Sequence, residues 1–230
     1  MGLLALGLLA AGGAGAWAIR GDAPLGSLRF WERPGQDGAA LEALGLYGEV
    51  PDFALMDRSG RTVARADLLG HVWLANFVYT QCTETCPLQS AVVARLQGEF
   101  GQPELRFVSI TVDPERDTSA VLARYAARYG ADPVRWLFLT GDKRAIYRLA
   151  MEGFRLGVVD PDDPKPSAGL WPWIEPRVAW AAHGSKGLVM HSQRLVLVDR
   201  RARIRAYHLP DDEASLRRLR ANLRTLLREA

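Results

Sequence analysis

The chain is poor in the residue types that build stapled or strongly charged proteins. Only two of its 230 residues are cysteines, which excludes the disulfide framework of small secreted domains. Its net charge is only +3, and its arginine-rich tracts occur without a base-stacking or groove-reading motif, so we expect no nucleic-acid partner. With 48% hydrophobic and 24% charged residues, the composition is that of an ordinary globular protein with one core and some extensions.

The N-terminal segment lacks charge. Met1 to Ile19 is rich in Leu, Ala and Gly and ends at Arg20, and about 20 apolar residues can cross a bilayer as a helix. The small residues near Ala16 and Ala18 are also compatible with a signal-peptide cleavage site. No basic residue precedes the apolar run, so the sequence does not specify its orientation. Either interpretation exports the rest of the chain to a compartment where a functional thiol pair can be oxidised.

Three segments follow from composition. We expect a membrane anchor or signal segment at residues 1–20 and a flexible linker, rich in Gly, Pro and charge, at residues 21–48. The folded domain is expected at residues 49–230, opening with a short hairpin.

Within this domain, apolar runs alternate with helical patterns. Strands alternating with helices predict an α/β fold with a central sheet flanked by helices, and a terminal hairpin adds antiparallel strands. A thiol motif after the first central strand indicates the thioredoxin architecture. We predict strands at 72–78, 105–112, 135–139, 187–198 and 203–207, and helices from just after Cys86 to about Phe100 and at 118–129, 142–152 and 213–229.

The two cysteines, Cys82 and Cys86, lie between the predicted strand 72–78 and the helix that follows. Pro87 suits a first helical turn, which predicts that Cys86 caps the helix and that its thiolate is stabilised there. If the loop folds into a single turn, the two Cα atoms lie about 6 Å apart, which suits a disulfide. The same separation lets both sulfurs reach one metal ion. Two thiols without a function remain the simplest alternative.

The spacing of the two cysteines and the positions of the histidines help to distinguish a disulfide from a metal site. Thioredoxin-type exchange enzymes favour two residues between their cysteines, whereas this chain has three, which leaves more room for a metal. Two thiolates favour Cu(I), and an added imidazole supports both Cu(I) and Cu(II). His71 lies at the wrong end of its strand, His208 is expected at the surface, and His183 lies in an irregular loop. His191, at the start of a strand, is the best candidate, although a single histidine is more often structural or solvated.

Three separated motifs occur in an order that resembles the Sco/SenC family, over about Val50 to Tyr207. This family comprises membrane-anchored, thioredoxin-fold copper proteins that serve cytochrome oxidase assembly. The motifs are Thr80-x-Cys82-x-x-x-Cys86-Pro87, then Val112-Asp113-Pro114-Glu115-Arg116-Asp117-Thr118, then His191-Ser192 leading to Leu197-Val198-Asp199.

The resemblance implies a site and a role. The copper ligands of the family fall on Cys82, Cys86 and His191, and its acidic residue near the site falls on Asp113, as an outer-shell or partner-docking group. It implies copper, as Cu(I) or Cu(II), and delivery of copper to, or reduction of cysteines in, the binuclear copper centre of a cytochrome c oxidase subunit. Other copper carriers are further expected partners. The location implied is the inner (cytoplasmic) membrane, with the N-terminus anchoring a domain on the periplasmic side.

The sequence also departs from the family pattern. The hairpin tip at Asp199 to Arg203 lacks a glycine that is common there. Residues 160–187 form an unusual insert with Trp171, Trp173 and Trp180, which suits a local core, a membrane interface or a partner-docking surface.

Other functions remain open from the sequence. A metal-independent thiol-disulfide oxidoreductase would use Cys82 and Cys86 without His191. A peroxiredoxin-like peroxidase shares the fold, but the Pro-x-x-x-Thr-x-x-Cys tract of that family is absent. A redox or copper sensor is a fourth candidate.

Overall fold

The computed structural model describes residues 40–83, 85–156, 158–159, 189–190 and 193–229. The chain divides into two compact units, Met1–Pro34 and Gly35–Ala230, and the described residues all belong to the second unit. The predicted membrane segment and most of the predicted linker therefore lie outside the described residues, as does most of the tryptophan-rich insert. Among the helices that are described, none combines the length and the apolar character needed to cross a membrane.

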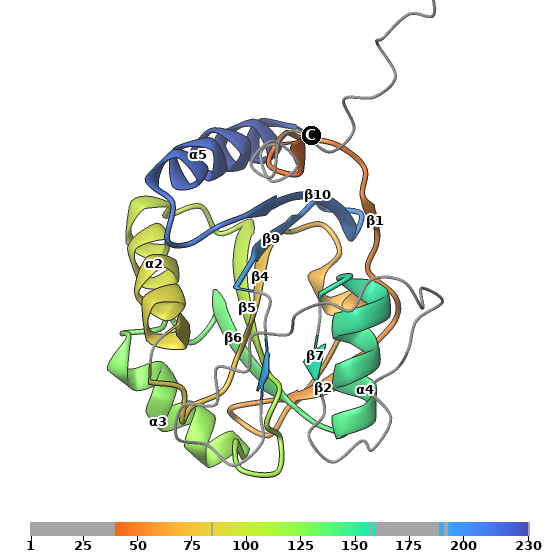
Figure 1. Cartoon of the computed structure of the whole chain (residues 1–230), viewed down its shortest axis with the longest axis vertical. Helices are drawn as coiled ribbons and strands as arrows, with labels where there is room; N and C mark the ends of the chain where they lie inside the picture. Colours follow the sequence, from red (N-terminus) through yellow and green to blue (C-terminus); the bar gives the residue numbers. More distant parts are fainter. Residues whose placement is uncertain (1–39, 84, 157, 160–188, 191–192, 230) are drawn as a thin grey trace, which may run out of the picture. The chain divides into compact units, whose positions relative to one another are not determined.

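The domain is built on one mixed sheet (Figure 1). Its three central strands, β4, β5 and β6, run parallel, while β9 joins β4 and β2 joins β6 in antiparallel pairs. The strand order is β1-β10-β9-β4-β5-β6-β2-β3. The strands are β1 (Gly48–Glu49), β2 (Ala54–Asp57), β3 (Thr62–Ala64), β4 (Val72–Val78), β5 (Leu105–Thr111), β6 (Trp136–Thr140), β9 (Leu195–Val198) and β10 (Arg203–His208).

Helices cover both faces of this sheet, as the thioredoxin-like fold requires (Figure 1). One face packs against α2, α3 and α5, and the other against α4 and the π-helix η2. The helices are α2 (Thr85–Glu99), α3 (Ser119–Arg128), α4 (Lys143–Arg148), η2 (Leu149–Gly153) and α5 (Glu213–Arg228), with a 3-10 turn η1 at Arg65–Leu68.

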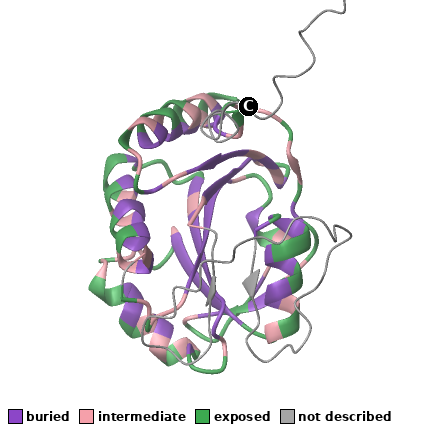
Figure 2. Ribbon diagram, in the orientation of Figure 1, coloured by how far each residue is buried: buried purple, intermediate pink, exposed green. Residues whose placement is uncertain are grey.

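The alternation of side chains along β4 explains the two-sided core. All seven of its residues are buried, because a central parallel strand has helices on both sides. Leu74 packs in the cluster beneath α2, α3 and α5, whereas Trp73 and Phe77 pack in the cluster beneath α4 and η2. Figure 2 shows the buried central strands between the half-exposed helices.

Most predicted elements are confirmed, with small shifts at their ends. Thr118 caps α3 as predicted, since its side chain accepts a hydrogen bond from the backbone N–H of Val121. The strand predicted over 187–198 was wrong as a single element, because β9 covers only Leu195–Val198. Upstream, β8 (Val189–Met190) pairs instead with β7 (Val158–Val159) in a separate two-stranded sheet.

The end of the predicted linker packs on the domain. Tyr207 donates its backbone N–H to Leu41, and Tyr47 donates its own to Ile204, both in hydrogen bonds to carbonyl oxygens. Glu42, which is buried, forms an ion pair with Arg218 of α5. We therefore place the start of the folded domain near Leu41.

The hairpin between β9 and β10 accommodates its missing glycine by backbone strain. Ala202 has a φ of 59°, in the left-handed region that favours glycine. Asp199 stabilises the tip, because its carboxylate accepts hydrogen bonds from the backbone N–H groups of Arg201 and Arg203 and from the side chain of Arg205.

Candidate functional site

The two cysteines lie where β4 passes into α2, at the carboxyl end of a central parallel strand. This edge of an α/β sheet is where such folds place their ligands, because the loops there meet in a crevice. Cys82 is half-buried in the loop, and Cys86 is buried in the first turn of α2. Both cysteines are reduced in the structure.

The helix begins at Thr85, two residues earlier than predicted, and this changes the role of each sulfur. Cys86 is the second residue of α2 rather than its cap. Its backbone N–H donates a 3.3 Å hydrogen bond to Sγ of Cys82, and the Thr85 hydroxyl lies 3.6 Å from the same sulfur. The Cys82 sulfur therefore takes the position in which a capping side chain receives the N–H groups of a first helical turn.

The expectation of a stabilised thiolate at Cys86 was wrong. A hydrogen bond from its thiol to Cys82, together with burial and with negative charge on Cys82, raises the pKa of Cys86 above its usual value. The pair therefore retains a proton on Cys86, and the more exposed Cys82 is the sulfur available to a metal or a partner.

Hydrogen bonds from α3 also fix the first turn of α2. Tyr125 donates a 3.5 Å hydrogen bond to the carbonyl of Cys86, and its hydroxyl lies 2.9 Å from Oγ of Ser90. Burial raises the pKa of Tyr125, so the phenol remains protonated and can donate. These contacts fix the backbone that carries Cys86.

A buried polar chain lies beneath the same helix. Asn76 of β4 donates to Gln89 of α2 at 3.1 Å and accepts from Ser109 of β5 at 2.8 Å. Trp136 of β6 completes the chain with a 2.9 Å hydrogen bond from its indole N–H to Ser109. Because Gln89 lies three residues after Cys86, this chain fixes the height of the first helical turn above the sheet.

The structure places Asp113 two residues after β5, where it is buried and bound within its own loop. Arg116 donates a 2.9 Å hydrogen bond to the Asp113 carboxylate. The backbone N–H of Asp113 donates to Oγ1 of Thr111. The residue that reaches the cysteine loop is instead Asp117, whose carboxylate accepts hydrogen bonds from Thr80. Asp117 lies in the second sequence motif but had no role assigned, because motif order alone does not say which carboxylate points to the cysteines.

The histidine expectations have different outcomes. His191 and His183 lie outside the described residues, so the predicted third ligand is untested. His71 lies at the start of β4, away from the cysteines, as expected. The expected surface position of His208 was wrong, because it is fully buried beneath α5, 3.2 Å from the side-chain nitrogen of Asn222.

The donor set of the described residues fits a soft metal in part. Two adjacent thiols are the ligands that Cu(I) prefers. Within the described ranges, no group of three or more His, Cys, Asp or Glu side chains comes together, so a third ligand would come from another part of the chain or from a partner.

Comparisons with known proteins identify the family. The SCO1/SenC family model matches residues 45–228. The SCO1 protein homolog of Bacillus subtilis is 34% identical over 117 residues, which span 50% of this chain and 61% of that protein, less than two thirds of its length.

Two solved structures share the fold. BsSco, a member of the Sco family of cytochrome c oxidase assembly proteins in which a disulfide switch was identified, superposes with a TM-score of 0.62 at 23% identity, covering 80% of this chain and 97% of its own. Copper-bound ScoI of Bradyrhizobium japonicum gives a TM-score of 0.54 at 24% identity, covering 75% of this chain and 99% of its own. Because the family model matches well over half of the chain, the chain belongs to the SCO1/SenC family.

Proposed function

We propose that this protein binds copper through Cys82 and Cys86 and serves the assembly of cytochrome c oxidase. The observation that carries the proposal is the placement of two reduced, hydrogen-bonded thiols at the carboxyl edge of the central sheet. The ScoI relative with bound copper and the oxidase-assembly role of the Sco family support this assignment.

Copper is here the cargo rather than a resident cofactor. Cys82 and Cys86 would supply two thiolates, and His191 would complete the site as the imidazole ligand. Binding displaces the proton that the pair holds on Cys86, so uptake is expected to release protons and to weaken in acid. Asp113, already bound to Arg116, would act on the neighbouring loop or in partner docking rather than on copper itself.

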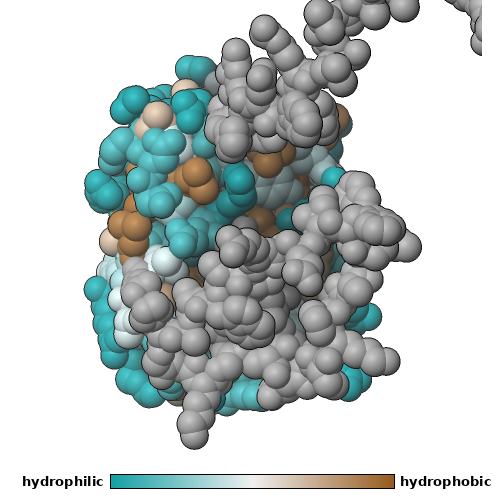
Figure 3. Space-filling model, viewed as in Figure 1, coloured by the Kyte–Doolittle hydropathy of each residue, from teal (hydrophilic) through white to brown (hydrophobic). Residues whose placement is uncertain are grey.

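The recipient and the location follow from the same proposal. The copper-bearing subunit of cytochrome c oxidase would receive the metal or have its cysteines reduced, and other copper carriers would supply it. The apolar N-terminal segment would hold the domain at the outer, periplasmic face of the inner membrane. Figure 3 shows a described surface that is mostly hydrophilic with small hydrophobic patches. Leu88, two residues after Cys86, is a large hydrophobic residue that is 42% exposed.

A metal-independent thiol-disulfide oxidoreductase is the second candidate. The hydrogen bond between the cysteines favours it, because a proton held on the buried Cys86 leaves Cys82 as the attacking sulfur. Metal transfer and thiol reduction would use the same two sulfurs. The two candidate functions therefore differ in whether the activity requires His191.

The deciding experiment is a Cu(I) titration of the reduced full-length chain, with the bound metal counted. Wild type is compared with His191→Ala, and His71→Ala at the opposite end of β4 is the matched control. One tightly held copper in wild type and in the His71 variant, weakened at least about tenfold without His191, supports the copper carrier. No retained copper, or retention indifferent to His191, favours the oxidoreductase.

A further inference from the structure

A buried carboxylate joins the two loops that meet at the cysteines. Asp117 is 1% exposed and accepts three hydrogen bonds. Two come from Thr80, through its backbone N–H at 3.0 Å and its hydroxyl at 2.5 Å, and one comes from the hydroxyl of Thr111 at 2.6 Å. Hydrogen bonds to a buried carboxylate are stronger than those between neutral groups, so this contact is a firm anchor.

The carboxylate is itself held in one position. The backbone N–H of Asp117 donates to the carbonyl of Asp113 at 2.8 Å, which closes the turn after β5. The hydroxyl of Thr111 also accepts the N–H of Asp113 at 3.0 Å. Thr118, the next residue, caps α3. Asp117 thus sits between the end of a strand and the start of a helix, which leaves its side chain little freedom.

The anchor ties the cysteine loop to the end of β5, through Thr80 on one side and Thr111 on the other. The β4–β5 ladder already extends to the pair Val78 and Thr111, and Val112 donates one more hydrogen bond to Val78 at 2.9 Å. The two bonds that Thr80 donates to Asp117 lie beyond the point where this ladder ends. They therefore fix residues that the sheet leaves unsupported, two positions before Cys82.

Two further hydrogen bonds close the loop on either side of Cys82. Cys82 donates its backbone N–H to Tyr79 at 3.2 Å, and Sγ of Cys82 accepts the N–H of Cys86. These contacts belong to the reduced pair. Closing the disulfide must bring Sγ of Cys82 into bonding contact with the other sulfur, which changes its position at the start of α2.

We propose that Asp117 is a positioning residue that holds the cysteine loop in its reduced geometry and so sets the thiol–disulfide equilibrium of Cys82 and Cys86. The inference deepens the proposed function, since it concerns the same two sulfurs. It does not depend on copper, because the equilibrium exists without metal.

The test is the equilibrium of the full-length chain with reduced and oxidised glutathione, free of metal. In this exchange the chain forms one S–S bond and gives up two hydrogen atoms, and one glutathione disulfide takes them up to become two glutathione thiols. The variants are Asp117→Asn, which keeps the shape but removes the charge and one of the two acceptor oxygens that Thr80 uses, and Thr80→Val, which removes only the hydroxyl. Thr80→Ser keeps a hydroxyl at that position, and Asp199→Asn removes another buried carboxylate, near the other end of β4.

We expect the equilibrium constant for oxidation to rise about threefold to tenfold in Asp117→Asn and in Thr80→Val, because the reduced form loses one hydrogen bond. Thr80→Ser should stay near wild type, and Asp199→Asn should lower the unfolding midpoint without moving the equilibrium. If Asp117→Asn does not fold, Thr80→Val carries the test.

Other results have distinct meanings. The inference would be overturned if the equilibrium constant for oxidation of Thr80→Val equalled that of wild type or moved toward the thiol form. It would also be overturned if Asp199→Asn shifted this constant as much as Asp117→Asn does. A wild-type chain that forms no disulfide would overturn both the inference and the thiol-exchange part of the proposed function. Failure of wild type to bind copper would leave the inference standing.

Discussion

The backbone N–H of Cys86 points at Sγ of Cys82 across 3.3 Å, so one cysteine caps the helix turn in which the other lies. The two sulfurs are therefore not equivalent. Cys82 is half-buried and receives the hydrogen bond, while Cys86 is 5% exposed and keeps its proton. A partner thiol or a metal arriving from solvent meets Cys82 first.

Alkylation should reveal this difference. At neutral pH, we expect iodoacetamide to modify Cys82 in the reduced chain at least about tenfold faster than Cys86, since each unit of raised pKa removes about tenfold of the reactive thiolate. Mass spectrometry of timed samples measures both rates. In denaturant the two rates should converge, and equal rates in the folded chain would contradict the proposed asymmetry.

The polar chain beneath α2 gives a prediction about stability. Gln89→Met removes the acceptor for the side-chain amide of Asn76 and leaves a buried N–H without that bond. We expect a loss of about 1–3 kcal/mol in the free energy of unfolding, measured with urea. Gln102→Met, at an exposed position, should change it by less than about 0.5 kcal/mol. Equal effects in the two variants would show that the amide contact contributes little.

The fold could be predicted because its patterns are local. Mostly apolar runs marked β4, β5 and β6, and a single capping residue, Thr118, marked the start of α3. The order of these elements then determined the sheet. The pairing of β8 with β7 could not be predicted, because a two-residue strand carries no periodic signal.

The candidate site was predictable only in part. Spacing identified Cys82 and Cys86, but not which sulfur would hold the proton, since that depends on where the helix begins. Asp117 was visible in a motif, yet its contact with Thr80 joins positions 37 residues apart. Burial of His208 was missed because the strand pattern does not show that α5 packs over its end.

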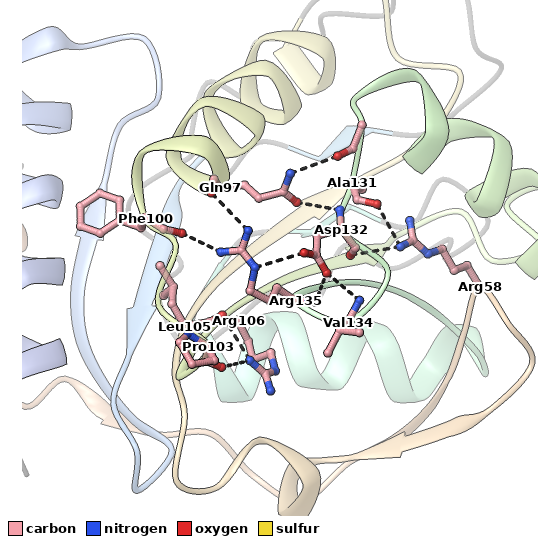
Figure 4. A network of polar contacts seen from close by, with 11 residues as sticks. Arg58, Gln97, Phe100, Pro103, Leu105, Arg106, Ala131, Asp132, Val134 and Arg135 are labelled. Carbon is pink, nitrogen blue, oxygen red and sulfur yellow. Dashed lines mark hydrogen bonds and ion pairs between the residues drawn. The ribbon is translucent and has the colours of Figure 1, made fainter.

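The far end of α2 should matter for stability and not for the thiols. Arg135 donates to the carbonyls of Phe100 and Gln97 at 2.6 and 3.4 Å and to the carboxylate of Asp132 at 3.2 Å, as Figure 4 shows. A guanidinium in this position satisfies carbonyls that the end of the helix leaves without partners.

We expect Arg135→Met to lower the free energy of unfolding by about 1.5–3 kcal/mol, because hydrogen bonds from a charged group are lost. Arg135→Lys should recover only part of the lost free energy of unfolding, since an ammonium group lacks the planar arrangement of donors that a guanidinium has. Urea unfolding measures the loss, and the alkylation rate of Cys82 in the folded variants should match wild type. A changed rate would mean that the two ends of α2 are coupled.

Burial of His208 makes the fold sensitive to acid. Burial lowers its pKa from 6.5 to about 4, and the charges of Glu42, Arg218 and Arg194 act on it more weakly. Its ring nitrogens lie near Ser215, at 3.5 Å from Nδ1, and near the side chain of Asn222. Between these two pKa values the unfolded chain binds a proton that the folded chain does not, so stability falls as the pH drops from 6.5 toward 4.

From pH 7 to pH 5, this one group should cost wild type about 2 kcal/mol of unfolding free energy. His208→Gln cannot take up the proton. Between pH 7 and pH 5, the unfolding free energy of the variant should therefore decrease by about 2 kcal/mol less than that of wild type, even if the variant is less stable at pH 7. Urea unfolding of both proteins at the two pH values measures the difference. Parallel falls in the two proteins would assign the acid sensitivity to other groups, such as His71, whose pKa burial also lowers.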